Sequence, residues 1–136
     1  MFDFGHLLLT TPRLTLRPLR PADAAAVFAL HADPVGMRYW ATPPWSDPAQ
    51  ADTLIAQDQA ALAAGDYIRL GLERRGDASL VGLCSLFAFQ LDSRRAETGY
   101  MLARDCWGGG LMHEALQTLL GYGFGVLDLN RVEADI

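Results

Sequence analysis

The sequence predicts one α+β domain in which a mixed, mostly antiparallel central sheet is flanked by helices. Three observations lead to this class. The chain has 136 residues, 51% of them hydrophobic, which is enough for one domain with a sizeable core. Its apolar residues switch between strand and helix periodicity along the chain. The second half has the order strand, strand, strand, glycine-rich loop, helix and final strand, which gives antiparallel hairpins and one right-handed crossover.

The first half of the chain is expected to supply one strand and two helices. Residues 7–19 alternate as a strand, and residues 21–31 follow as an alanine-rich helix. Ser46 suits the N-cap of a second helix, which should extend over residues 48–64.

The second half is expected to supply the rest of the sheet and the crossover. Residues 67–73 and 80–89 are predicted to form a hairpin whose turn contains Arg74 and Arg75. A strand ending at Leu102, a helix over 111–127 and a strand over 131–136 should follow. The two strands that flank this helix should be parallel neighbours, with a ligand at their carboxyl ends.

The glycine triplet Gly108 to Gly110 is the strongest candidate for a binding site. A helix N-terminus has unpaired N–H groups and partial positive charge, and glycine lets a phosphate approach the backbone. The alternative is a merely flexible loop. The dinucleotide fingerprint fails because His113 occupies the place of its last glycine. The P-loop fails because the chain contains no lysine.

Three separated motifs resemble the GNAT family of acetyl-coenzyme A-dependent N-acetyltransferases, and in particular its RimJ/RimL-like branch. The glycine loop is similar to the family's Q/R-x-x-G-x-G/A, with Trp107, Gly110 and Met112 at the fixed positions. Trp and Met depart from the general pattern but are familiar in that branch. Residues 95–102 resemble its A-E-x-G-Y strand, and residues 11–17 resemble its opening T-x-R-L-x-L-R.

This resemblance implies the acyl-CoA N-acyltransferase fold and a definite reaction. Acetyl-CoA would donate its acetyl group to a primary amine, either a protein or peptide N-terminal α-amine or a small-molecule amine. The amine would attack directly, with help from a general base. The alternative is a non-catalytic acyl-CoA-binding or sensor domain. The implied fold continues past the strand 131–136, so we expect residues 1–136 to be a single N-acetyltransferase domain, truncated in or after that strand and thus C-terminally incomplete.

Glu97 is the expected catalytic base. It lies in an otherwise apolar strand, where partial desolvation would raise its pKa and suit it to take a proton from an ammonium. The alternative is an exposed residue paired with Arg94 or Arg131. Glu114, at the start of the long helix, is expected to be structural. The proton donor for the thiolate stays unassigned.

The resemblance also implies the cofactor contacts. The backbone of Met101 and Leu102 would pair with the pantetheine arm, and the Met101 N–H would donate to the thioester oxygen. Backbone N–H groups of the loop would hold the pyrophosphate. The full cofactor set is Met101, Leu102, Trp107, Gly108, Gly109, Gly110, Leu111, Met112 and His113.

The aromatic loop at residues 37–47 is the expected wall of the acceptor cleft, through Tyr39, Trp40 and Trp45. The alternative is that these side chains cap the core. In members of the resembled family, the segment between the first two helices usually contacts the acceptor. The sequence leaves both interpretations open.

Composition and residue spacing argue against nucleic acid, metal ions and membranes as partners. A formal net charge of −5 argues against nucleic acid as a partner. No metal site is expected, because the two cysteines and three histidines show no ligand spacing. Residues 7–9 are too short an apolar run for a signal peptide or a membrane span, so we expect a cytoplasmic protein that does not bind membranes. Its partners would be acetyl-CoA, an amine and, in a homodimer, a second copy.

Overall fold

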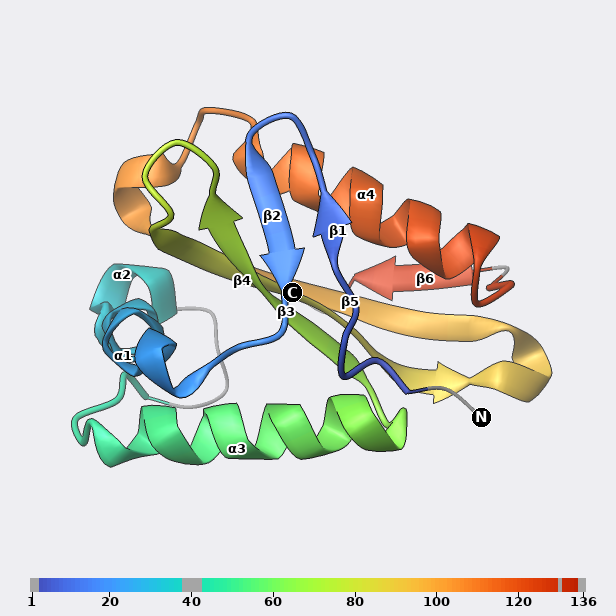
Figure 1. Ribbon diagram of the computed structural model, residues 1–136, viewed down its shortest axis with the longest axis horizontal. Helices are drawn as coiled ribbons and strands as arrows, with labels where there is room; N and C mark the ends of the chain where they lie inside the picture. Colours follow the sequence, from blue (N-terminus) through green and yellow to red (C-terminus); the bar gives the residue numbers. More distant parts are fainter. Residues whose placement is uncertain (1–2, 38–42, 130, 135–136) are drawn as a thin grey trace.

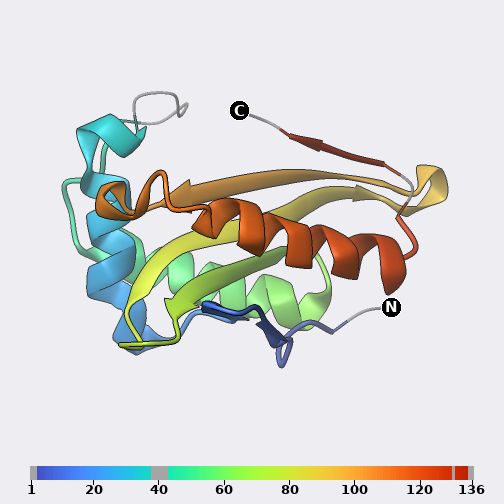
Figure 2. The ribbon, with the colours of Figure 1, turned by 90° about the horizontal axis from the view of Figure 1, so that it is seen from above.

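The computed structural model describes residues 3–37, 43–129 and 131–134. In this part of the chain the strands form one sheet in sequence order, antiparallel except for the last pair, which is parallel. Figure 2 shows the strands following one another in that order. The predicted fold class, with its mixed and mostly antiparallel sheet, is confirmed. The strands are β1 (Leu9–Thr10), β2 (Leu14–Arg17), β3 (Ile68–Arg74), β4 (Leu80–Gln90), β5 (Arg95–Leu102) and β6 (Arg131–Ala134).

The helices cover both faces of the sheet, with α4 on one side and α1 to α3 on the other (Figure 1). A large core lies mainly between α4 and the sheet, and a smaller one lies between α1, α3 and the sheet. Among the described residues, no helix is long and apolar enough to cross a membrane. The helices are α1 (Ala24–Ala32), α2 (Pro34–Met37), α3 (Ala49–Ala64) and α4 (Leu111–Gly125), with 3-10 turns η1 (Pro21–Asp23), η2 (Leu91–Ser93) and η3 (Arg104–Cys106).

The expected single strand over residues 7–19 is wrong, because this segment is a hairpin. The Thr11 N–H donates to the Leu14 carbonyl at 2.9 Å, which closes a tight turn around Pro12 and Arg13. The chain therefore reverses, and Leu9 pairs with Leu16 across the β1–β2 ladder. The turn brings residue 13 to the side of the sheet where α4 begins.

The predicted N-cap of α3 is also wrong. The helix begins at Ala49 with Pro48 at the N-cap, and no side-chain cap bond is formed there. The Gln50 side chain instead accepts hydrogen bonds from the Ser46 and Asp47 N–H groups at 3.3 and 3.2 Å. The Ala49 N–H, at the start of the helix, donates to the Asp47 carboxylate at 3.0 Å, so Asp47 and not the Ser46 hydroxyl accepts from this first-turn donor.

Arg17 joins three elements beneath α1. Its guanidinium binds both carboxylate oxygens of Asp23 in η1, at 2.8 and 2.9 Å, and also binds Glu73 of β3 at 3.0 Å. Arg17 and Asp23 are both buried. Burial alone would raise the pKa of Asp23, but the hydrogen bonds from Arg17 and the Arg20 N–H outweigh it and lower that pKa. The last arginine of the T-x-R-L-x-L-R motif is therefore a structural tie between β2, η1 and β3.

The crossover from β5 through α4 to β6 forms as predicted, and β5 and β6 are parallel neighbours. The helix ends at Gly125 instead of near residue 127. A Cβ on Gly123 would lie 3.2 Å from Leu86 Cδ1 and 3.1 Å from Leu129 Cδ1. At this position glycine lets α4 approach the sheet closely.

Candidate active site

The glycine loop leads into α4 in a conformation that requires glycine at two positions. Gly108 and Gly110 have φ of +83° and +80°, and Gly110 is the N-cap of the helix. The first helical hydrogen bond runs from the Glu114 N–H to the Gly110 carbonyl. Among the described residues, no acceptor is found for the backbone N–H groups of residues 108–113. A row of unpaired donors at a helix N-terminus is suited to bind an anion.

A set of hydrogen bonds fixes this loop to the β1–β2 turn. Glu114 accepts from the Thr11 hydroxyl, from the Arg13 N–H at 2.9 Å and from Arg13 Nε at 2.9 Å. The Arg13 Nη1 donates to the Gly109 carbonyl at 2.9 Å. Partial burial would raise the pKa of Glu114, but the Thr11 and Arg13 bonds prevail and lower it. The structural role expected for Glu114 fits these contacts.

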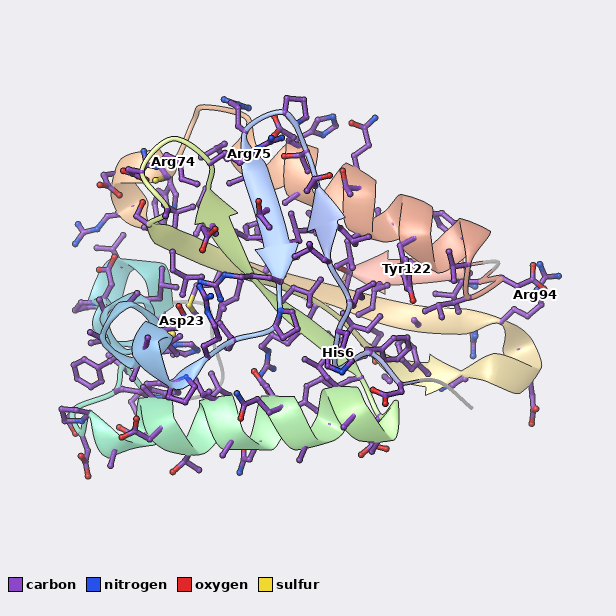
Figure 3. All side chains as sticks on the ribbon, viewed as in Figure 1. His6, Asp23, Arg74, Arg75, Arg94 and Tyr122 are labelled. Carbon is purple, nitrogen blue, oxygen red and sulfur yellow. The ribbon has the colours of Figure 1, made fainter. Side chains whose placement is uncertain are left out.

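The turn between β3 and β4 places two more arginines beside the loop (Figure 3). Arg75 donates from Nη1 to the Thr11 carbonyl at 2.9 Å, and its N–H donates to the Arg13 carbonyl at 2.9 Å. Arg74 Nη2 lies 3.8 Å from the Cys106 sulfur in η3. Arg13, Arg74 and Arg75 therefore bring positive charge to the region of the loop, with Arg13 paired to Glu114 and Arg74 paired to Asp77 at 3.5 Å.

The edge of β5 facing away from β4 continues the site. β6 pairs with β5 only over Arg95–Thr98, so in the described part of the chain the second half of β5 has no strand on that side. The Ala103 N–H donates to the Val81 carbonyl at 2.8 Å, and a Cβ on Gly82 would meet the Met101 oxygen at 2.5 Å. Since backbone groups alternate along a ladder, the N–H and C=O of Met101 face β4, and those of Leu102 face outward.

This alternation changes one expected contact. The Met101 N–H is directed into the β4–β5 ladder, so it does not face a ligand at the free edge as expected. Trp107 Nε1 donates to the outward Leu102 carbonyl at 2.8 Å. This bond fixes the half-exposed indole of Trp107 at the end of β5, next to the loop. Tyr100 and Leu102 therefore present the outward backbone N–H groups of this edge.

Glu97 is half-buried on the sheet face opposite α4, where its strand neighbours are Phe87 on β4 and residue 133 on β6. Within the described residues, no hydrogen-bond or ion-pair partner reaches its carboxylate. The pairing with Arg94 that was considered does not form, because Arg94 binds Asp128 at 2.9 Å. Glu97 and Leu102 are five strand residues apart, about 16 Å. A ligand anchored at the loop must therefore extend along β5 to reach Glu97.

The face that carries Glu97 also carries a polar row that the sequence did not single out. Arg69 on β3 lies opposite Ser85 on β4, and Ser85 lies opposite Gly99 on β5. Asp58 of α3 is fully buried and accepts hydrogen bonds from the Tyr67 hydroxyl at 2.5 Å and from Arg69 Nη1 at 2.9 Å. Spacing could have revealed Asp58, because it lies on the helical stripe of Ala51, Ile55 and Leu62.

Burial is the main cause of the pKa shifts of the titratable groups in and near this row. Desolvation raises the pKa of Asp58 despite the opposing effects of Arg69 and Tyr67. Burial and the Asp58 carboxylate together raise the pKa of Tyr67 to about 12, so its hydroxyl stays protonated. Desolvation likewise lowers the pKa of His31, which is buried nearby in α1.

The expected acceptor wall is described only in part. Trp45 stacks on His31 with ring centroids 3.8 Å apart and planes 10° apart. Trp45 packs against the smaller core and also lines an open pocket of about 380 Å³ with the first turns of α3. Tyr39 and Trp40 lie outside the described residues. The contacts of Trp45 agree with both interpretations of the aromatic loop.

The remaining candidates for proton transfer or nucleophilic attack are separated from the loop or from Glu97. Tyr100 is 40% exposed and belongs to the α4 face of β5, opposite to the face of Glu97. Tyr122 lies in the distal half of α4 (Figure 3). Its ring packs edge-on against Phe4. Cys84 is buried, which raises its pKa to about 12 and keeps it a thiol.

A helix N-terminus with unpaired N–H groups that continues into a strand edge left uncovered by the described residues is suited to an extended, phosphorylated donor molecule. The half-buried carboxylate of Glu97 lies farther along the same strand. This arrangement is typical of a group transferase.

Comparison with known proteins identifies the family. The Acetyltransferase (GNAT) domain matches residues 13–136. The uncharacterized N-acetyltransferase p20 of Bacillus licheniformis is 34% identical over 94% of this chain and 72% of its own. The putative ribosomal N-acetyltransferase YdaF of Bacillus subtilis is 32% identical over 88% of this chain and 66% of its own. Mycobacterium smegmatis RimJ, solved with CoA-disulfide, shares the fold with a TM-score of 0.83 at 24% identity, over 98% of this chain and 69% of that chain.

The chain therefore belongs to the GNAT acetyltransferase family and is an acetyl-CoA-dependent acetyltransferase. The resemblance drawn from the three sequence motifs is confirmed, and the name of the YdaF relative agrees with a RimJ/RimL-like branch. The chain spans about 72% of the length of the first relatives it matches.

Proposed function

We propose that this domain transfers acetyl from acetyl-CoA to the primary amine of an acceptor, with a protein or peptide N-terminus as the favoured class. The observation that supports it most is the continuity between the N–H groups of residues 108–113 and the edge of β5 beyond Thr98, which both lack a backbone partner within the described residues. The name of the YdaF relative favours a ribosomal protein as acceptor and the cytoplasm as location.

The cofactor would lie along this continuous edge. Its pyrophosphate would accept hydrogen bonds from the loop, where Arg13, Arg74 and Arg75 add favourable charge. Its pantetheine arm would pair with the outward backbone groups of Tyr100 and Leu102. The side chain of His113 is exposed, so we expect it to contribute little beyond its N–H.

Glu97 would act as the general base. An amine must lose a proton to attack a thioester, and Glu97 presents a half-buried carboxylate with no ion-pair partner in the described chain. It would take the proton directly or through one water. The acetyl group is already activated as a thioester, so no covalent enzyme intermediate is required.

The test combines cofactor binding with turnover. Acetyl-CoA at about 100 times its dissociation constant should stabilise the fold by roughly 2.7 kcal/mol, measured by thermal melting. Free thiol release should then be followed with a panel of peptides and small amines. Glu97→Gln should lose turnover and keep the thermal shift, whereas Asp92→Asn, an exposed acidic control, should keep both. Binding without turnover on any amine by the unmodified protein would favour a sensor domain.

A further inference from the structure

Arg69 occupies the centre of the sheet face that carries Glu97. It lies opposite Ser85, which lies opposite Gly99, so the three form a row across β3, β4 and β5. Glu97 is two residues from Gly99 on the same face. The Cα atoms of Arg69 and Glu97 are separated by two strand spacings across the sheet and by two residues along the strand, which together give about 12 Å. The two long side chains can thus face a small group between them.

The Arg69 side chain is fixed by its neighbours, but only some of its hydrogen-bond donors have an acceptor among the described residues. Its Nη1 binds both oxygens of Asp58, at 2.9 and 3.3 Å, and its guanidinium carbon lies 5.4 Å from the centroid of the Tyr67 ring. Its Nε and Nη2 donors find no acceptor in the part of the chain that the structure describes. The side chain is 30% exposed, so these donors can be reached from solvent. A guanidinium fixed in this way is suited to an oxygen acceptor.

Residue 99, on the same sheet face as Arg69, is a glycine and carries no side chain. A Cβ on Gly99 would lie 3.4 Å from Ser85 Oγ and 3.5 Å from the Phe87 ring. At this position glycine adds no side chain to the face between Arg69 and Glu97, where the Ser85 hydroxyl and the Phe87 ring already lie close to the backbone.

The buried carboxylate beside Arg69 is closed to a cationic acceptor. Asp58 has no exposed surface, and both of its oxygens are bonded to Arg69, so it offers nothing to a polyamine. The accessible group beside it is the Arg69 guanidinium, which repels ammonium groups and binds carbonyl or carboxylate oxygens.

We propose that Arg69 determines acceptor specificity by binding the carbonyl oxygen next to the reacting amine, so that the acceptor is an α-amino acyl group such as a peptide N-terminus. This proposal rests on the proposed function and specifies its acceptor. The α-amine would face Glu97 while the first carbonyl meets Nε or Nη2 of Arg69. A polyamine has no oxygen to offer this donor.

The test measures acetyl transfer to three acceptors: a tripeptide amide, propylamine and spermidine. The unmodified protein should show a higher kcat/KM for the tripeptide than for the other two. Arg69→Lys keeps a cation beside Asp58 but removes the planar pair of donors. It should raise the tripeptide KM by about 10- to 100-fold, as expected for a lost charged hydrogen bond, and leave the acetyl-CoA KM unchanged.

Controls separate this role from a structural one. The double variant Asp58→Asn and Arg69→Gln also removes the Arg69 donors, but it leaves no buried carboxylate without a partner. Arg94→Gln removes a surface arginine at the opposite end of the molecule from Arg74, and it should leave all three acceptors unaffected (Figure 3).

Two results would overturn the proposal while acetyl transfer itself stands: a preference of the unmodified protein for spermidine, or an unchanged ratio of tripeptide to propylamine kcat/KM in Arg69→Lys. If the unmodified protein binds acetyl-CoA and acetylates none of the three, the proposed function fails and this inference fails with it.

Discussion

Arg13 and Glu114 are 101 residues apart in the sequence, and their side chains meet at 2.9 Å between Nε and Oε1. This contact connects the turn before β2 to the first turn of α4. Because the Arg13 Nη1 also binds the Gly109 carbonyl, the pair sets the position of the loop as well as the helix. It explains why the T-x-R-L-x-L-R motif and the glycine loop, distant in the sequence, belong to one site.

We predict that Glu114→Gln weakens acetyl-CoA binding several-fold and lowers the free energy of unfolding by about 1 kcal/mol. The reason is loss of the carboxylate that accepts from Thr11 and Arg13, although the half-exposed Arg13 limits the value of the ion pair. Titration calorimetry and chemical unfolding measure the two effects. Unchanged affinity beside reduced stability would show that the loop holds its shape without Glu114.

We predict that Gly110→Val abolishes acetyl-CoA binding. A β-branched residue is strained at φ of +80°, and its Cβ would lie 3.5 Å from Arg13 Nη2, where the loop must stay open. His113→Ala is the matched control and should bind normally, because only its backbone N–H is expected to contact the cofactor. Comparable calorimetric titrations for Gly110→Val and the unmodified protein would disprove the loop assignment.

We predict that Trp45→Ala lowers stability, because the indole stacks on His31 and packs on the smaller core. It should also raise the KM of the acceptor more than the KM of acetyl-CoA. Steady-state kinetics with each substrate varied in turn distinguishes the two roles. Loss of stability with both Michaelis constants unchanged would mean that Trp45 only caps the core.

We predict that His31 makes the protein less stable as the pH falls. Its folded pKa is lowered by desolvation, so the unfolded chain binds the proton more readily below the unfolded value of about 6.5. Its contribution is thus complete above that pH and is lost below it. The facing groups act in opposite directions, since Arg69 lowers the pKa of His31 and Asp58 raises it.

The measurement for this prediction is urea unfolding at pH 8 and pH 5.5, with His31→Gln as the comparison. The difference in stability between the two pH values should be larger for the unmodified protein. Asp58 has the opposite sign, because its raised pKa favours the folded state at acidic pH and that contribution is lost as the pH rises. The Asp58→Asn variant therefore separates the two groups. Equal pH dependence in the unmodified protein and His31→Gln would exclude His31 as the source.

Much of the fold could be predicted because local patterns agree with it. The hairpin of β3 and β4, the crossover through α4 and the glycine loop before this helix all follow from periodicity and turn residues. The β1–β2 hairpin was missed because its strands are short and share one alternating run. Its turn is fixed by a bond from Thr11 to Leu14 and by distant contacts to Glu114, which alternation does not encode.

The site was predicted less completely, for a similar reason. The glycine loop and Glu97 carry local signals, one through backbone conformation and the other through its place in an apolar strand. Arg69, Asp58 and Tyr67 become neighbours only when α3 packs on β3. The direction of the Met101 N–H depends on the phase of the β4–β5 ladder, which the sequence does not set.

The two described tryptophans lie on the two sides of the proposed reaction, and each has a defined polar partner. The Trp107 indole donates to Leu102 beside the cofactor loop, while Trp45 stacks on the His31 imidazole beside α3. Their emission should therefore report separately on occupancy of the loop and on the charge state of His31. With Trp40 and one of these two tryptophans replaced by phenylalanine, each single-tryptophan variant would report on one of the two events without an attached dye.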